Sequence, residues 1–177
     1  MYGSEDTGDK PPNLGSMLAP DAMAARLCDV PIAALRARGI CGIILDLDNT
    51  LVGFGLDEPD EASGAWVREA TAAGLRIVLL SNNFPERVAR VAGALGIGGI
   101  PNALKPLPFG FARALKHLAL PGRAVAVVGD QLFTDMLGGK LFGCYTVLTE
   151  PIEHRDFPLT RVFRFFERFV LAHRRSS

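Results

Sequence analysis

The 177-residue sequence lacks several features that would assign it to a specialised class of protein. Its 19 Lys and Arg residues balance its 19 Asp and Glu residues, so the overall charge gives no reason to expect a nucleic-acid partner. No apolar run is long enough to span a membrane, and the acidic segment MYGSEDTGDKPPN at the N-terminus does not resemble a signal peptide. We therefore expect a cytoplasmic protein, and leave open a peripheral contact with a membrane.

Cysteine is also scarce. Cys28, Cys41 and Cys144 are far apart and show no spacing typical of a metal site, so we expect reduced thiols in an intracellular protein. Nearly half of the residues are apolar, which predicts a globular chain with a proper core. Residues 1–16, rich in Gly, Pro, Ser and Asp, are predicted to be a disordered leader, and residues 17–177 to be one domain.

Apolar strand patterns alternate with helical patterns along this domain. After short helical turns over 20–38, we predict strands at 40–47, 75–83, 100–104, 124–130 and 144–149, and helices at 59–74, 85–96, 105–120 and 131–143. Such alternation indicates an α/β fold in which helices cover both faces of a mostly parallel sheet, as in three-layer Rossmann-like proteins. Ligands of such sheets bind at the carboxyl ends of the strands.

Polar residues lie at or directly after the carboxyl ends of four predicted strands, which a parallel sheet would bring to one edge. They are Asp46, Asp48 and Thr50, then Ser81, Asn82 and Asn83, then Lys105, and finally Gly129, Asp130, Gln131, Thr134 and Asp135. Each group has a simpler explanation: an Asp often caps a helix, Ser-Asn-Asn is a common turn, and lysine is usually solvated. The convergence of all four groups at one edge favours a functional site.

Three carboxylates in one crevice repel one another, at a cost of about 4 kcal/mol for two charges about 4 Å apart. Mg²⁺ offsets such repulsion and prefers oxygen ligands, and Asp46 and Asp130 are the natural pair for it. Lys105 adds a second positive charge, and Ser81 and Asn82 can donate hydrogen bonds to a phosphoryl group. One carboxylate of the Asp-x-Asp pair can attack phosphorus while Asp48, two residues on, transfers protons.

The segments "LDLDNTLV", "LLSNN", "KP" and "VVGDQLFTDMLGGKLFG", in this order, resemble the four motifs of phosphatases of the haloacid dehalogenase (HAD) superfamily. The resemblance is closer to the YqeG-like, type IIIA branch, and it extends through the tail "EPIEHRDFPLTRVFRFFERFVL", from about Leu18 to Arg174. The wider YqeG-like group includes phosphatidylglycerophosphate phosphatases.

The resemblance implies a role for each matching residue. Asp46 would be the nucleophile and a Mg²⁺ ligand, and Asp48 the acid/base, with its backbone carbonyl on the metal. Ser81 and Asn82 would bind the phosphoryl group, and Lys105 would stabilise the phosphorylated intermediate. The remaining implied roles are Mg²⁺ ligation by Asp130, support of the loop by Thr50, and direct or water-mediated help from Asp135.

Neither gap between motifs has room for a cap domain, so we predict an open site that admits a large phosphate ester such as a lipid head group. At the C-terminus, residues 158–173 are predicted to form a basic amphipathic helix. This helix can lie on an anionic membrane, or it can pack its apolar face on the sheet.

We therefore expect a Mg²⁺-dependent phosphomonoesterase, with phosphatidylglycerophosphate as a candidate substrate. Phosphatases of sugar, nucleotide or protein esters remain alternatives, as does a non-catalytic module that binds a phosphate group or a protein partner. A phosphorelay receiver is disfavoured, because its phosphorylated Asp normally ends a later strand.

Overall fold

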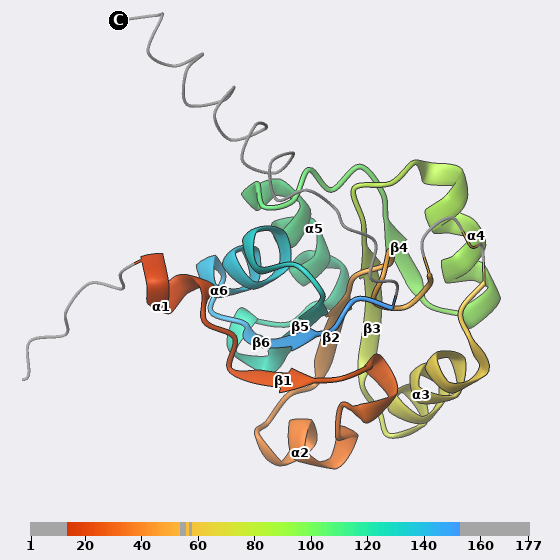
Figure 1. Cartoon of the computed structure of the whole chain (residues 1–177), viewed down its shortest axis with the longest axis horizontal. Helices are drawn as coiled ribbons and strands as arrows, with labels where there is room; N and C mark the ends of the chain where they lie inside the picture. Colours follow the sequence, from red (N-terminus) through yellow and green to blue (C-terminus); the bar gives the residue numbers. More distant parts are fainter. Residues whose placement is uncertain (1–13, 54–55, 57, 153–177) are drawn as a thin grey trace, which may run out of the picture.

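The computed structural model describes residues 14–53, 56 and 58–152. Six strands form one sheet, in the order β1-β6-β5-β2-β3-β4, and every neighbouring pair is parallel (Figure 1). The strands are β1 (Ala22–Ala24), β2 (Gly42–Leu45), β3 (Arg76–Leu80), β4 (Gly98–Ile100), β5 (Val125–Gly129) and β6 (Tyr145–Thr149). The predicted parallel sheet is confirmed.

Helices cover both faces of the sheet. They are α1 (Leu14–Leu18), α2 (Ile32–Ala37), α3 (Glu61–Ala72), α4 (Pro85–Leu95), α5 (Pro108–Leu118) and α6 (Leu137–Leu141), with helical turns η1 (Leu27–Asp29), η2 (Gly122–Ala124) and η3 (Leu132–Met136). Side chains of η1, α2, α3 and α4 share one apolar core, whereas α5 packs in the other core with Phe142, which follows α6. This arrangement confirms the predicted three-layer α/β architecture.

Strand β2 shows why the sheet is buried on both sides. Ile43 and Leu45 enter the first core and Ile44 enters the second, because successive side chains of a strand point to opposite faces. The continuous apolar run in the sequence is therefore the pattern of a central strand.

The first strand was not predicted. Residues 22–24 were expected in helical turns, but they pair with β6 along the edge of the sheet. The Asp21 carboxylate holds this edge in place by accepting hydrogen bonds from the backbone N–H and the hydroxyl of Thr146. Tertiary pairing thus overrides the helical preference of the alanines.

Strand β4 was predicted too late in the sequence, at residues 100–104. It begins at Gly98 because α4 packs directly on it: a Cβ on Gly99 would lie 2.8 Å from the Val88 side chain and 3.1 Å from the Ala92 Cβ. The glycines that suggest a loop therefore allow a close helix–sheet contact.

Between β2 and β3, α3 is the one regular element of the described residues, and between β3 and β4 it is α4. No cap domain is inserted at either place, as predicted. Helix α1 begins at Leu14, inside the segment expected to be a leader, while residues 1–13 and the predicted helix at 158–173 lie outside the described residues. Within those residues, no helix combines the length and apolar character that a membrane crossing requires.

Candidate active site

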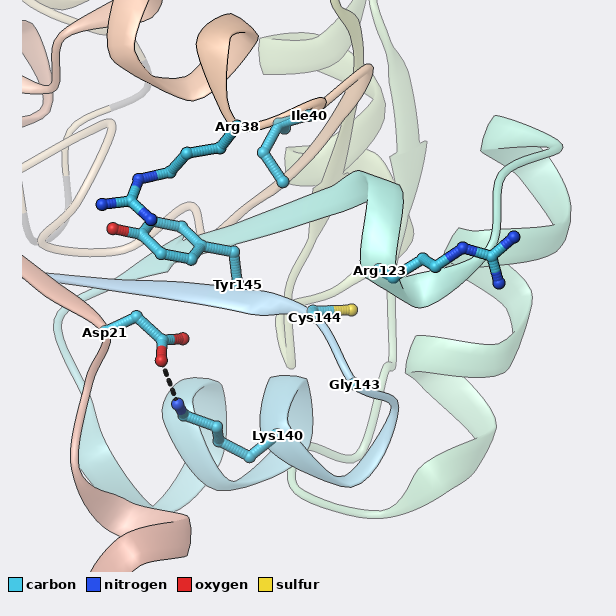
Figure 2. A pocket seen from close by; sticks show the side chains of 8 residues that line it. All are labelled: Asp21, Arg38, Ile40, Arg123, Lys140, Gly143, Cys144 and Tyr145. Carbon is cyan, nitrogen blue, oxygen red and sulfur yellow. Dashed lines mark hydrogen bonds and ion pairs between the residues drawn. The ribbon is translucent and has the colours of Figure 1, made fainter.

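A hollow of about 430 Å³ lies at the amino-terminal edge of the sheet (Figure 2). Two of its three cationic side chains have partners, because Lys140 pairs with Asp21 and the Arg38 guanidinium stacks 4.9 Å from the centre of the Tyr145 ring. None of the residues predicted to be functional lines this hollow. The chemistry therefore has to be sought at the opposite edge.

At the carboxyl edge, β2 has β3 on one side and β5 on the other, and the chain reverses its direction across the sheet there. Such a reversal is where α/β sheets bind their ligands. Asp46 follows β2 directly, and its N–H donates a 2.9 Å hydrogen bond to the carbonyl of Val128 in β5. Asp130 follows β5 directly, so the two predicted carboxylates meet at this point.

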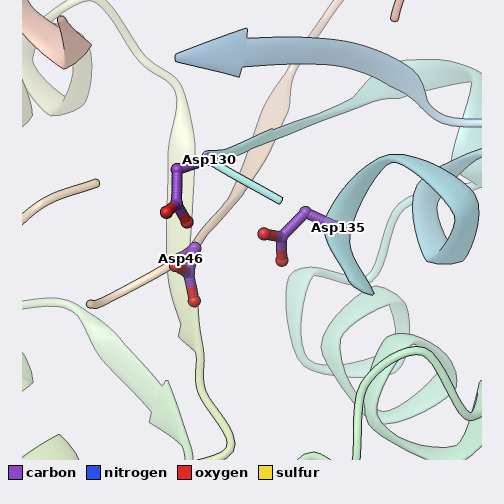
Figure 3. A group of neighbouring side chains, drawn as sticks. All are labelled: Asp46, Asp130 and Asp135. Atoms are coloured by element: carbon purple, nitrogen blue, oxygen red, sulfur yellow. The ribbon is translucent and has the colours of Figure 1, made fainter. Parts of the chain in front are cut away.

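Three carboxylates converge at this edge (Figure 3). Each of Asp46, Asp130 and Asp135 offers an oxygen that lies within 4.8 Å of the other two. The Asp46 Oδ2 atom is buried and has no hydrogen-bond partner among the described residues. A buried carboxylate oxygen without a donor is destabilising unless a cation contacts it, and all-oxygen donors are what Mg²⁺ prefers. These residues therefore fit the predicted Mg²⁺.

Lys105 enters the same cluster from the segment after β4. Its Nζ lies 2.5 Å from Asp46 Oδ1 and 2.6 Å from Asp135 Oδ1, and only 4% of its side chain is exposed. Burial alone would lower the pKa of Lys105, but the charges and hydrogen bonds of Asp135 and Asp46 outweigh it, so the pKa rises above its usual value. Lys105 therefore carries a permanent positive charge in this buried cluster.

One ammonium cannot balance three carboxylates, and the pKa values reflect the surplus. Burial, followed by the charge of Asp135, raises the pKa of Asp130 to about 6. Burial also raises the pKa of Asp46 well above its usual range, although Lys105 opposes this change. A bound divalent cation would supply the missing positive charge and keep both groups ionised at neutral pH.

The backbone of Lys105 is held by Asn82. The Asn82 Oδ1 atom accepts a 2.7 Å hydrogen bond from the Lys105 N–H, and the Asn82 Nδ2 atom donates a 3.3 Å bond to the Lys105 carbonyl. The Asn82 side chain is thus engaged with the main chain of Lys105. The backbone N–H of Asn82 remains the group to consider for phosphate binding.

Asp48 is not a member of the three-carboxylate cluster. Its Oδ1 lies 2.9 Å from an Arg87 nitrogen, and its Oδ2 accepts a 3.2 Å hydrogen bond from Asn83 Nδ2. The side chain of Asp48 is 26% exposed, against 6% for Asp46. The two carboxylates of the Asp-x-Asp pair therefore have different environments, one buried and one partly exposed.

The other predicted residues also lie at this edge. The Thr50 hydroxyl is 3.5 Å from Asp130 Oδ1. The buried Ser81 hydroxyl accepts a 3.1 Å hydrogen bond from the Asn83 N–H, so its own proton is available to another acceptor. Asp135 lies on the wide turn η3, where the N–H of Met136 donates to the carbonyl of Gln131, five residues earlier.

Gly129 allows Asp135 to approach. A Cβ on Gly129 would lie 2.5 Å from Asp135 Cγ, closer than two unbonded carbons can approach. The glycine that precedes Asp130 is therefore required by the packing of the third carboxylate, and wide helical turns such as η3 are frequent at functional sites.

Comparison with known proteins agrees with this geometry. Residues 53–143 match the haloacid dehalogenase-like hydrolases. The "Probable phosphatase YqeG" of Bacillus subtilis (strain 168) is 35% identical over 159 residues, which cover 90% of this chain and 92% of that protein. This chain belongs to the haloacid dehalogenase-like hydrolase family. The predicted resemblance to its YqeG-like phosphatases is confirmed, and with it the assignment of the chain as a phosphatase.

Two further proteins are similar to this HAD-family hydrolase. "Phosphatidylglycerophosphate phosphatase 1, chloroplastic" of Chlamydomonas reinhardtii is 32% identical over 167 residues, 89% of this chain, but the match spans only 62% of that longer protein. The cobalt-bound form of the deoxy-D-mannose-octulosonate 8-phosphate phosphatase of Haemophilus influenzae superposes with a TM-score of 0.53 at 17% identity, over 63% of this chain and 69% of that one. The second similarity shows a shared fold.

Arg87 is the residue of this hydrolase that the sequence prediction missed. It occupies the third position of α4, where a cation is unfavourable beside the positive end of the helix dipole. An arginine at that position, four residues after the "SNN" motif, was the available signal. The structure shows its compensating contacts with Asp48 and with the carbonyl of Leu56 at 2.8 Å.

Proposed function

We propose that this HAD-family phosphatase is a Mg²⁺-dependent phosphomonoesterase that works through an aspartyl-phosphate on Asp46, with phosphatidylglycerophosphate as its substrate. The observation that carries the proposal is the convergence of Asp46, Asp130 and Asp135 with a buried, unpartnered oxygen on Asp46. Asp46, Asp130 and the backbone carbonyl of Asp48 would hold the ion, and Asp135 would contribute directly or through water. The ion would neutralise the carboxylates and the incoming phosphate.

In the first step the chain forms a covalent bond to phosphorus. The Ser81 hydroxyl and the Asn82 N–H donate hydrogen bonds to the phosphoryl oxygens and orient the ester. The Asp46 carboxylate attacks phosphorus, and the bond from phosphorus to the ester oxygen breaks. Asp48 gives its proton to that leaving oxygen, so an alcohol departs and Asp46 becomes an acyl phosphate.

In the second step water accepts the phosphoryl group from Asp46. Asp48, now a carboxylate, takes a proton from water as the water oxygen attacks phosphorus. The bond between phosphorus and Asp46 breaks and inorganic phosphate leaves, so that Asp46 is again a carboxylate and Asp48 again carries its proton. Lys105 stays charged throughout. Its positive charge neutralises negative charge beside Asp46 while the phosphoryl group is transferred.

Burial supports this division of work between the two residues. Asp46 is enclosed and contacts a fixed cation, as a nucleophile that must be held in place requires. Asp48 is partly exposed and fixed by Asn83 and Arg87, so it can exchange protons with a leaving group and with water.

The substrate proposal has two supports. The described residues contain no cap domain over the site, so a phosphate on a large molecule has access to it. The Chlamydomonas reinhardtii relative is named a phosphatidylglycerophosphate phosphatase, although this chain spans only 62% of its length. A phospholipid substrate would also place the enzyme at a membrane surface, as a peripheral protein.

The test is phosphate release from a panel of lipid, sugar, nucleotide and phosphopeptide esters, with Mg²⁺ and with a chelator. We expect turnover of phosphatidylglycerophosphate above the other esters, and none after chelation. The Asp46→Asn variant should fold, as judged by circular dichroism, and release no phosphate. Wild-type activity in that variant would refute the mechanism, and a preference for another ester would refute the substrate.

A further inference from the structure

We infer that an apolar rim around the catalytic opening inserts into a lipid bilayer and holds the active site against the head-group layer. This inference rests on the proposed function, and it adds the surface through which the enzyme meets its substrate. The described residues expose nine large apolar side chains, and seven of them follow the carboxyl ends of strands. We call these seven the apolar rim: Leu56, Phe84, Leu104, Leu107, Phe109, Leu132 and Ile152.

The rim residues are neighbours of the catalytic residues in the sequence. Phe84 follows the Ser81–Asn83 segment directly, Leu104 precedes Lys105, and Leu132 comes two residues after Asp130. The most exposed members are Phe84 at 73% and Phe109 at 68%. Exposed large apolar side chains near a polar site are a feature of interaction surfaces.

Hydrogen bonds connect the loops that carry the rim. The N–H of Asn102 donates to the carbonyl of Asn83 at 3.0 Å, which ties the loop of Phe84 to the loop of Leu104. Ile152 donates its N–H to the carbonyl of Asn49 at 3.0 Å, and Arg87 binds the carbonyl of Leu56. These bonds hold the segments of Phe84, Leu104, Leu56 and Ile152 at the edge of the sheet that carries Asp46 and Asp130.

Leu104 is exposed and has an unusual backbone conformation. Its φ is +54°, in the left-handed region that a bulky side chain rarely adopts and that glycine or asparagine adopts easily. The chain keeps a leucine there, 60% exposed, beside the catalytic lysine.

The position of the rim favours a lipid bilayer as the partner that it contacts. A second copy or a protein partner seated on a surface that surrounds the opening would cover the entrance to Asp46. A bilayer that contains a phospholipid monoester instead delivers the substrate through the contact. Exposed cations lie behind Phe109, because Arg113 and Lys116 are one and two turns further along α5, whereas exposed Glu58, Glu86 and Glu150 lie near other rim residues. Phenylalanine at the tip with cations behind it is typical of interfacial helices on anionic lipid.

The first test places a fluorescent reporter in the rim of the full-length chain. The single native tryptophan, Trp66, is buried and donates a 2.8 Å hydrogen bond to Val30, so its emission should not respond to vesicles. We expect Phe109→Trp to shift to shorter wavelength with phosphatidylcholine–phosphatidylglycerol vesicles, and to be quenched by brominated lipid. The control Leu141→Trp, at an exposed position on α6 outside the rim, should not respond. An unquenched Phe109→Trp would overturn the inference.

The second test removes the rim. The double variant Phe84→Ser/Phe109→Ser should lose vesicle binding by roughly tenfold or more, because two aromatic side chains no longer enter the bilayer. Its turnover of phosphatidylglycerophosphate in vesicles should fall with the binding. Its turnover of p-nitrophenyl phosphate, which is soluble, should stay within about twofold of wild type, as for other surface substitutions. The matched control Met23→Ser/Leu141→Ser should change none of these values.

Two results would overturn the inference here. One is vesicle binding by the double variant at wild-type strength. The other is a wild type that is dimeric in light scattering and a double variant that is monomeric, with vesicle binding unchanged. A second copy of the chain would then occupy the rim. Failure of the proposed function gives a different result: the wild type would hydrolyse neither ester, while Phe109→Trp would still be quenched by lipid.

Discussion

The ammonium of Lys105 lies 2.5 Å from a carboxylate oxygen of Asp46, although 59 residues separate them in the chain. Both side chains are buried, so each depends on the other for compensation of its charge. The pair also joins the segment after β2 to the segment after β4 at the catalytic edge. This contact is consequently a source of stability, and in the proposed mechanism it also contributes to reactivity.

Replacement of Lys105 by methionine should destabilise the protein strongly. It leaves Asp46 and Asp135 without their cation, and loss of one partner of a buried pair costs about 3 kcal/mol or more. The loss in the free energy of unfolding, measured with urea at neutral pH, should be smaller in acid, where the carboxylates take up protons. The control Lys140→Met removes a partly exposed pair with Asp21 and should cost about 1 kcal/mol or less. Equal losses in the two variants would contradict the account.

Mg²⁺ should stabilise the protein more at about pH 7.5 than at about pH 5. The pKa of Asp130 is about 6 in the folded chain, above its ordinary value of 3.8, so the folded state binds more protons than the unfolded state between these two pH values. Metal-free stability therefore falls as pH rises through this window, and Mg²⁺, which needs ionised carboxylates, reverses the fall.

Thermal unfolding with and without Mg²⁺ measures this effect. The Asp130→Asn variant should lose most of the Mg²⁺-dependent rise in melting temperature at the higher pH. A rise of the same size at both pH values in the wild type would show that the three-carboxylate cluster does not bind the ion.

Substitution of Gly129 by alanine should reduce the rate of phosphate release strongly and should affect the stability of the sheet less. The new methyl group would collide with the Asp135 carboxylate, whose Cγ lies 2.5 Å away, and displace it from Lys105. We expect phosphate release to fall by about tenfold or more, as for other small displacements in active sites. Gly93→Ala on α4 is the control, because nothing lies within 4 Å of its new Cβ and it should gain about 0.5–1 kcal/mol of stability. Unchanged activity in Gly129→Ala would show that the position of Asp135 is unimportant.

Arg87 should act through Asp48 as a positioning residue. The Arg87→Met variant frees the acid/base from one of its two fixed contacts, so we expect kcat for phosphate release to fall by about 10- to 100-fold. Arg87→Lys should restore part of the loss, because a cation returns near Asp48. Arg68→Met removes an exposed pair with Glu61 on α3 and should leave kcat unchanged. If Arg87→Met and Arg68→Met behave alike, Arg87 has no role in catalysis.

The sequence predicted the central strands and the converging carboxylates well, for a physical reason. Strands β2 and β5 are buried on both faces, so their continuous apolar runs and the Asp that follows each are visible in the sequence. Parallel topology then brings Asp46 and Asp130 to one edge. These predictions needed only the order of elements along the chain.

The missed features depend on contacts between distant segments. Strand β1 exists because it pairs with β6, and β4 begins at a glycine because α4 lies against it. The engagement of Asn82 with Lys105 and the contact of Arg87 with Asp48 depend on side-chain geometry across loops. Local pattern carries no information about such pairings, and so these residues received incomplete roles or none.

The central claim, that Asp46 accepts the phosphoryl group, is tested most directly by capture of the covalent intermediate. The Asp48→Asn variant cannot activate water, so after incubation with Mg²⁺ and a phosphomonoester with a good leaving group it should accumulate phosphorylated enzyme. Mass spectrometry of the acid-quenched protein should find one added phosphoryl group, located on the peptide that contains Asp46 and absent from Asp46→Asn/Asp48→Asn. A phosphoryl group on another residue, or steady turnover by Asp48→Asn with no modified enzyme, would contradict the account.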